Sequence, residues 1–247
     1  MRKYKALAFD VGGSVFNWKD AIKDALEVVT AEQRIAIDPE SFAMEWRKHL
    51  FLVLMEVRRG ELPHMNVDAL LPIALQRIAP QFSQLELNES ATARLHRAWH
   101  NMQAWEDFPP ALARLKKKYM VMILTILSFS IVTDSSKASN ITWDGVISCE
   151  FLNHYKPEPG AYFEGCALMG FKPEEVCLVA VHPSDLMAAR AAGMGMAYCA
   201  PQLNEPDVPG QTLGELPAPE EYDYYAESFE ELAEMMCAGL EDYSDAV

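Results

Sequence analysis

The fold class is decided by the stretch Lys5-Ala6-Leu7-Ala8-Phe9-Asp10-Val11-Gly12-Gly13-Ser14. Its first half is a short apolar run of the kind that forms a buried strand, and Asp10 stands where that strand ends. Open α/β sheets place their chemistry at the carboxyl ends of strands. The two glycines permit a sharp turn and bring backbone amides close to a bound anion. The stretch predicts a central strand with a functional carboxylate, although an aspartate that only initiates a turn gives the same local pattern.

The chain after residue 106 alternates strands and helices, which favours the functional interpretation of Asp10. We expect strands near 119–124, 145–148, 176–181 and 195–199, separated by helices near 109–118, 131–139, 158–169 and 185–192. Strands that alternate with helices of this length are typical of a parallel sheet covered by helices. We therefore predict an α/β fold whose Rossmann-like core is built from residues 1–16 and 107–247.

The segment 17–106 has helical periodicity and no convincing strand. Leu26, Val28 and Val29 mark the apolar face of a first helix. Further helices are expected near residues 42–57, 67–78 and 90–102. We predict that 17–106 is a helical insertion that follows the first strand.

The composition is that of a globular protein, because half of the 247 residues are hydrophobic and none of the chain is low-complexity. Met1 to Tyr4 lead into a strand without an apolar signal stretch, and no segment has the apolar length that spans a bilayer. The five cysteines form no metal-binding spacing, which suits reduced thiols. We expect a cytoplasmic protein that does not enter membranes.

The net charge of −15 comes from one end of the chain. Residues 201–247 contain 13 Asp and Glu and no Lys or Arg, which leaves 23 acidic against 21 basic residues before them. Such a segment is usually a solvated face or tail, and less often an element that binds a partner or covers a site. The charge argues against nucleic-acid binding.

Polar side chains follow several of the expected strands. In chain order they are Asp10 with Ser14, then Thr125, then Lys156 after a loop, then His182 with Asp185. Because parallel strands bring their carboxyl ends to one edge of a sheet, these groups should converge in space. An aspartate, a threonine, a lysine and a second aspartate in this order are far more specific than any one of them alone.

At this point the chain resembles the haloacid dehalogenase superfamily, and within it the L-2-haloacid dehalogenase (type II) group. The resemblance runs from Lys5 to about Ala200 and includes the helical insertion. It implies that 17–106 form a cap domain over the core. Its most specific parts are residues 5–18, 124–150, the motif His154-Tyr155-Lys156-Pro157-Glu158-Pro159 with Tyr162, and residues 179–193.

The resemblance implies three catalytic residues. Asp10 is the expected nucleophile, whose carboxylate displaces the halogen with inversion and forms an ester. Lys156 is expected to keep Asp10 ionised and oriented, because a nearby cation favours a charged carboxylate. Asp185 is expected to position or deprotonate the water that cleaves the ester, although an aspartate at this place also caps a helix.

The resemblance also implies residues that bind the substrate. Ser14 and Thr125 would hold the substrate carboxylate and the developing oxyanion. Arg47, next to Trp46 on the insertion, matches an arginine that receives the departing halide, and Tyr162 matches a tyrosine that lines the site. Arg47 on an amphipathic helix is otherwise a surface charge, and Tyr162 is otherwise part of the core.

Four positions separate this chain from related patterns. Gly12 and Val181 stand where phosphatases of the superfamily carry acids for Mg²⁺, so no metal or cofactor is expected. Ile126 replaces an asparagine that helps to hold the halide, and Gly12 replaces a larger residue. His182 also stands where an asparagine is common, and it could donate a hydrogen bond in its place or titrate near neutral pH.

We therefore expect metal-independent hydrolysis of small 2-haloalkanoic acids to 2-hydroxyalkanoic acids, with fluoroacids among the candidate substrates. The partners would be the haloacid and water, and relatives of this type often form homodimers. One alternative is a hydrolase of the same fold that acts on another small carboxylate or a phosphoester. Another is a non-catalytic binding protein that kept the fold.

Overall fold

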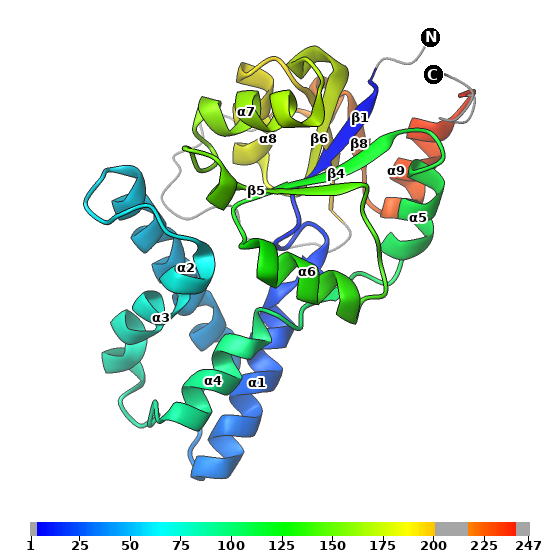
Figure 1. Ribbon diagram of the computed structural model, residues 1–247. Helices are drawn as coiled ribbons and strands as arrows, with labels where there is room; N and C mark the ends of the chain where they lie inside the picture. The colour runs from blue at the N-terminus through cyan, green and yellow to red at the C-terminus, as the bar shows by residue number, and fades with distance from the viewer. Residues whose placement is uncertain (1–3, 201–216, 241–247) are drawn as a thin grey trace.

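A six-stranded parallel sheet forms the centre of the fold, with the strand order β5-β4-β1-β6-β7-β8 (Figure 1). The computed structural model describes residues 4–200 and 217–240. The strands are β1 (Ala6–Phe9), β4 (Met120–Thr125), β5 (Gly145–Ser148), β6 (Val176–Ala180), β7 (Gly195–Cys199) and β8 (Tyr224–Ala226). The predicted α/β fold with a Rossmann-like sheet is confirmed.

The strand β1 lies between β4 and β6, with Phe9 paired with Ile123 and Val179. Every residue of β1 and β6 is buried, because helices cover both faces of the sheet and leave no polar side. The covering helices are α5 (Phe108–Leu115), α6 (Phe129–Ala138), α7 (Pro159–Met169), α8 (Pro183–Ala191) and α9 (Phe229–Cys237). This arrangement aligns the carboxyl ends of β1, β4 and β6 at one edge.

Four helices form a separate unit beside that edge (Figure 1). They are α1 (Trp18–Gln33), α2 (Pro39–Arg58), α3 (Val67–Ile78) and α4 (Glu89–Ala98). Each begins after an asparagine or aspartate whose side chain accepts a hydrogen bond from a backbone amide of the first turn, which stabilises a helix start. Short 3-10 turns occur at Ala79–Phe82, Cys149–Phe151, Pro173–Glu175 and Pro219–Glu221.

Three details of the helical unit differ from the sequence prediction. A two-stranded antiparallel pair, β2 (Phe16–Asn17) and β3 (Gln103–Ala104), joins its entry and exit, and strands this short leave no periodicity to detect. The fourth helix ends at Ala98 rather than near residue 102. Val28 does not belong to the buried face of α1, since 41% of it is exposed.

The acidic C-terminal segment is part of the fold where the structure describes it, and its acidic residues form a solvated face there rather than a tail. β8 is an edge strand of the sheet, and α9 packs on α5 through buried side chains that include Phe229 and Leu232. The acidic residues Glu230 and Glu234 lie on the exposed side of the same helix. The rest of the acidic segment, 201–216 and 241–247, lies outside the described residues.

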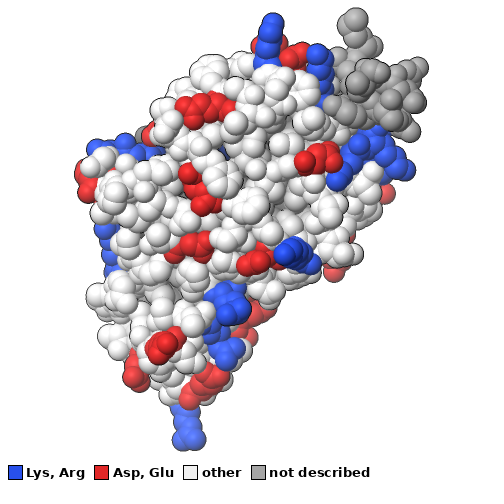
Figure 2. Space-filling view, viewed as in Figure 1, with Lys and Arg blue, Asp and Glu red and all other residues white. Residues whose placement is uncertain are grey.

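The surface and the thiols are those of an ordinary globular protein. On the face in Figure 2, acidic and basic side chains are interspersed, as on a solvated surface. The five cysteines are free, and all except Cys237 are buried. Among residues 4–200 and 217–240, no helix is both long and apolar enough to cross a bilayer.

Candidate active site

Asp10 directly follows β1 and is held by three side chains. Its Oδ2 atom accepts hydrogen bonds from the Ser14 hydroxyl at 2.7 Å and from Nδ1 of His182 at 3.1 Å. Its Oδ1 atom has one longer contact, 3.5 Å, with Nζ of Lys156. Only 7% of Asp10 is exposed. The two carboxylate oxygens are therefore unequal, and Oδ1 keeps more of its lone-pair capacity.

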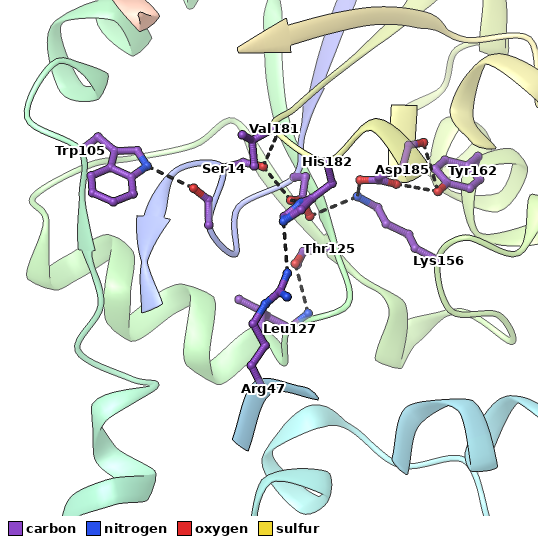
Figure 3. Close-up of polar contacts among 12 residues, drawn as sticks. Ser14, Arg47, Trp105, Thr125, Leu127, Lys156, Tyr162, Val181, His182 and Asp185 are labelled. Carbon is purple, nitrogen blue, oxygen red and sulfur yellow. Dashed lines mark hydrogen bonds and ion pairs between the residues drawn. The ribbon is translucent and has the colours of Figure 1, made fainter. Parts of the chain in front are cut away.

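The protonation of His182 follows from its second neighbour. Its Nε2 atom lies 3.3 Å from Nη2 of Arg47 (Figure 3). Because arginine has only donors, Nε2 must be the acceptor and carry no proton. The ring proton is then on Nδ1, where it donates to Asp10. In that tautomer His182 bridges the carboxylate and the arginine.

Lys156 and Asp185 form the other half of the site. Lys156 Nζ donates to Asp185 Oδ2 at 2.9 Å, so it lies closer to Asp185 than to Asp10. The hydroxyl of Tyr162 donates to Asp185 Oδ1 at 2.6 Å. All of these groups are buried, so the lysine is not the exposed loop residue that its neighbouring proline would permit. It is shared by two carboxylates.

The surroundings move the pKa values of the two aspartates in opposite directions. Burial alone would raise the pKa of Asp10, but the charge of Lys156 and the hydrogen bonds from His182 and Ser14 hold it below its usual range. Burial raises the pKa of Asp185 above its usual range, and the charge of Asp10 adds to this despite Lys156. Burial disfavours the charged form of Lys156, but the two carboxylates raise its pKa. Of the two carboxyls, Asp10 keeps its charge more readily, and Asp185 accepts a proton more readily.

A cavity of about 60 Å³ opens onto these groups. At about 10–15 Å³ for each water molecule, it holds a handful of waters or one very small organic acid. Of the residues predicted from the sequence, it is lined by Asp10, Gly12, Arg47, Thr125, Ile126, Lys156, His182 and Asp185. The strands and α2 therefore bring most of the predicted site together.

Arg47 reaches the cavity from α2 and is not a surface charge, because only 4% of it is exposed. Its guanidinium stacks on Trp18 and Phe51, with ring centroids 5.2 and 5.0 Å from its central carbon. Such stacking stabilises a buried guanidinium. The helical unit thus contributes a positive charge to the cavity that Asp10 lines.

Two predicted residues do not line the cavity. The Ser14 hydroxyl donates to Asp10 and accepts from the Val181 amide at 3.1 Å, so both of its roles are taken within the protein. Tyr162 lies behind Asp185 in the same way. They hold the carboxylates of Asp10 and Asp185, whereas the sequence suggested contact with the substrate.

Some of the backbone amides and hydroxyls that we expected to bind anions instead form hydrogen bonds within the loops around the site. The Gly13 amide donates to the carbonyl of Phe16 at 2.9 Å, so it does not point at a ligand as the glycine pattern suggested. Gly13 has a φ of 83°, a value that favours glycine and explains the tight turn. Thr125 accepts a hydrogen bond from the Leu127 amide at 3.1 Å and fixes the second loop.

Sequence reasoning missed most of the apolar wall of the cavity. It is made by Trp18, Leu50, Phe51, Trp99, Leu127 and Pro157, with Ser184 as an additional polar residue. Leu50, Phe51 and Trp99 had only helical periodicity as a signal, which also describes ordinary core residues. Trp18, Leu127 and Pro157 lie within stretches that resemble the family, but they were not assigned to the site. The carboxylates that line the cavity are those of Asp10 and Asp185, and Lys156 contacts both. This is a poor donor set for Mg²⁺, which needs several free oxygen ligands.

Comparison with known proteins agrees with this geometry. Residues 48–199 match the model of the family described as haloacid dehalogenase-like hydrolase. The chain belongs to that family. An (S)-2-haloacid dehalogenase of Burkholderia cepacia is 28% identical over 208 residues, 82% of this chain and 86% of the relative. One from Pseudomonas sp. strain CBS-3 is 31% identical over 185 residues, 70% and 79% of the two chains.

Solved structures of the haloacid dehalogenase-like family give the same result. A crystal structure of an L-2-haloacid dehalogenase superimposes with a TM-score of 0.85 at 28% identity, covering 96% of this chain and all of that chain. A defluorinating L-2-haloacid dehalogenase superimposes with a TM-score of 0.84 at 26% identity, covering 96% and 99%. The chain therefore falls within the L-2-haloacid dehalogenase group, and the predicted family is confirmed.

Proposed function

We propose that this protein hydrolyses small 2-haloalkanoic acids to 2-hydroxyalkanoic acids, with Asp10 as the covalent nucleophile. The observation that carries the proposal is an ionised carboxylate and a buried guanidinium in one small cavity, joined by His182. Displacement of a halide needs a nucleophile on one side of the carbon and an acceptor for the anion on the other. Relatives named for this reaction support the same conclusion.

In the first step, Oδ1 of Asp10 attacks the halogen-bearing carbon from the side opposite the halogen. A carbon–oxygen bond forms, the carbon–halogen bond breaks, and the halide leaves with the bonding electron pair toward Arg47. The configuration of the carbon inverts. Oδ1 is the attacking atom because Oδ2 already accepts two hydrogen bonds, whereas Oδ1 has only the long contact with Lys156.

In the second step, water attacks Cγ of the Asp10 ester, and Asp185 takes the proton from that water. The negative charge develops on Oδ2, where the Ser14 hydroxyl and Nδ1 of His182 donate to it. The intermediate collapses with cleavage of the Cγ–Oδ1 bond, and the departing alkoxide oxygen takes the proton held by Asp185. The hydroxy acid is released, and loss of the remaining carboxyl proton to solvent returns the Asp10 carboxylate. No step needs a metal ion, because the hydrogen bonds supply the charge stabilisation.

The size of the cavity supports a small acid as the substrate. About 60 Å³ suits a haloacetate or a 2-halopropionate and is too small for long-chain acids. Ile126 and Leu127 make part of the wall apolar, so it offers few donors to a large halide. Fluoroacids belong to the proposed range, in keeping with the defluorinating relative of similar structure.

The domain organisation, location and assembly are part of the same proposal. We assign residues 17–106 to a cap domain because Arg47 enters the cavity from this unit, and residues 1–16 and 107–247 to the core. The free cysteines suit a reducing cytoplasm. A homodimer would cover exposed apolar side chains such as Phe163 and Leu168 of α7. Light scattering after size-exclusion chromatography tests the assembly.

The proposal is tested by halide release from chloro-, bromo- and fluoroacetate and from both enantiomers of 2-chloropropionate, with EDTA present. We expect release that is lost in Asp10→Asn. If the folded protein released no halide from any of these substrates, the proposal would be refuted, and membership of the family would describe the fold only. Phosphate release from phosphomonoesters in the presence of Mg²⁺ would favour the alternative hydrolase.

A further inference from the structure

A second cluster of titratable side chains lies outside the catalytic cavity, where the helical unit meets the sheet unit. It consists of Asp68 in the first turn of α3, His96 on α4, and His100 just after α4. One ligand atom from each residue lies within 4.8 Å of the others. We infer that these three side chains form a binding site for a divalent transition metal, and that zinc is a suitable ion. The site is independent of the proposed dehalogenation.

The first support is the geometry of the donors. Nε2 of His96 lies 3.4 Å from Oδ1 of Asp68. Bonds of about 2.0–2.1 Å to a tetrahedral zinc place neighbouring ligand atoms about 3.4 Å apart, so this pair already has the required separation. Nε2 of His100 lies 2.7 Å from the same oxygen, and that contact would widen slightly to admit the ion. Two imidazoles and a carboxylate leave a fourth position for water.

The second support is the group that orients His100. Its Nδ1 atom lies 2.9 Å from Oδ2 of Asp134 on α6. A carboxylate on the other ring nitrogen is the usual partner of a metal-binding histidine, because it fixes the ring and directs Nε2 to the ion. Asp68 is also supported from α6, since Ser130 donates to its Oδ2 and its backbone amide donates to Ser128. The cluster therefore has both inner ligands and the groups that position them.

The site is open to an ion from solvent. His96 is 33% exposed, His100 19% and Asp68 22% by side chain, and a surface groove includes both histidines and Asp134. The ligands come from the helical unit, while Asp134 and Ser130 belong to α6 of the sheet unit. A bound metal would consequently join α3 to the end of α4, and the hydrogen bonds of Asp134 and Ser130 would hold the ligands against α6. Asp68 is far from the two histidines along the chain, so no sequence motif marks the site.

Calorimetric titration of the full-length protein, stripped with EDTA and then dialysed, with zinc chloride tests the inference. We expect one saturable site, and we expect His96→Gln and His100→Gln to weaken it at least tenfold. Asp134→Asn should weaken it by about 10- to 100-fold through the lost orientation of His100. His154→Gln is the matched control, because His154 also lies near two carboxylates, those of Glu158 and Glu164, without a second histidine.

A spectroscopic readout separates a built site from surface adsorption. Cobalt(II) bound by two histidines and an aspartate with water should give visible absorption of a four-coordinate ion that His96→Gln abolishes. Zinc should also raise the unfolding temperature of the wild type and of His154→Gln, but not that of His96→Gln. The inference is overturned if no saturable binding occurs, or if His96→Gln and His100→Gln bind zinc as the wild type does. Halide release in EDTA is measured separately, so failure of either proposal leaves the other intact.

Discussion

The two contacts of His182 can be separated by two substitutions of different length. The amide nitrogen of an asparagine reaches the position of Nδ1, so His182→Asn keeps a donor to Asp10 and loses the acceptor for Arg47. The amide of a glutamine reaches the position of Nε2, so His182→Gln keeps an acceptor for Arg47 and loses the donor to Asp10. Comparing the two variants shows which of the two contacts of His182 supports turnover.

The expected loss of kcat can be estimated from the negative charge on Asp10. A hydrogen bond to a charged group contributes about 1.5–3 kcal/mol, which corresponds to about tenfold to hundredfold in rate. Because the account places the oxyanion of ester hydrolysis on Oδ2, His182→Gln should lower kcat by that factor. His182→Asn should keep a larger part of the activity, and its loss should appear mainly in halide departure.

The assay is steady-state chloride release from 2-chloropropionate, with circular dichroism to verify that both variants are folded. Rapid-quench mass spectrometry distinguishes ester formation from ester hydrolysis. His182→Gln should accumulate the ester on Asp10. Wild-type kcat in a folded His182→Gln variant would refute the assignment of His182 as a donor to Oδ2.

Three further predictions concern the shared lysine and its carboxylates. Asp185→Asn should release halide once per enzyme molecule and then stop, because the ester forms and is not hydrolysed. Quench-flow kinetics and intact-protein mass spectrometry detect this single turnover. Sustained turnover would argue against the role of Asp185. As the pH falls, Asp185, with its raised pKa, should gain a proton before Asp10, whose pKa is lowered, so steady-state ester should increase in acid; a constant ester fraction by mass spectrometry would contradict this. Lys156→Met should cost about 3–5 kcal/mol of stability at neutral pH by leaving two buried carboxylates without their cation. Because burial then raises the folded-state pKa of a carboxylate above its unfolded value, this variant should become more stable as the pH falls, and urea unfolding that shows no such gain would count against the shared ion pair.

The sequence was enough to predict the sheet and most of the polar site. β1 is an uninterrupted apolar run with an aspartate at its end, and Lys156 and Asp185 stand at comparable places after later strands. Parallel topology then brings these groups together whatever the details of the loops. The family resemblance added Arg47, whose place on an amphipathic helix gave no sign of burial.

The features that the sequence did not predict depend on contacts that hydrophobic periodicity does not encode. β2 and β3 are too short to show a pattern, and the strand β8 was hidden by the acidic residues around it. The hydroxyls of Ser14 and Tyr162 were predicted at the site, but their hydrogen bonds to Asp10 and Asp185 depend on the tertiary structure. The apolar wall around Trp18 and Phe51 could not be separated from ordinary core packing.

The covalent role of Asp10 is tested most directly by a single turnover in water enriched in ¹⁸O, with enzyme in excess over 2-chloropropionate. In the account given above, water attacks Cγ of Asp10, and the oxygen in the first product comes from the carboxylate. We therefore predict an unlabelled hydroxy acid and ¹⁸O in the peptide that contains Asp10. A labelled product with an unlabelled Asp10 would show direct attack of water on the substrate and would contradict the account.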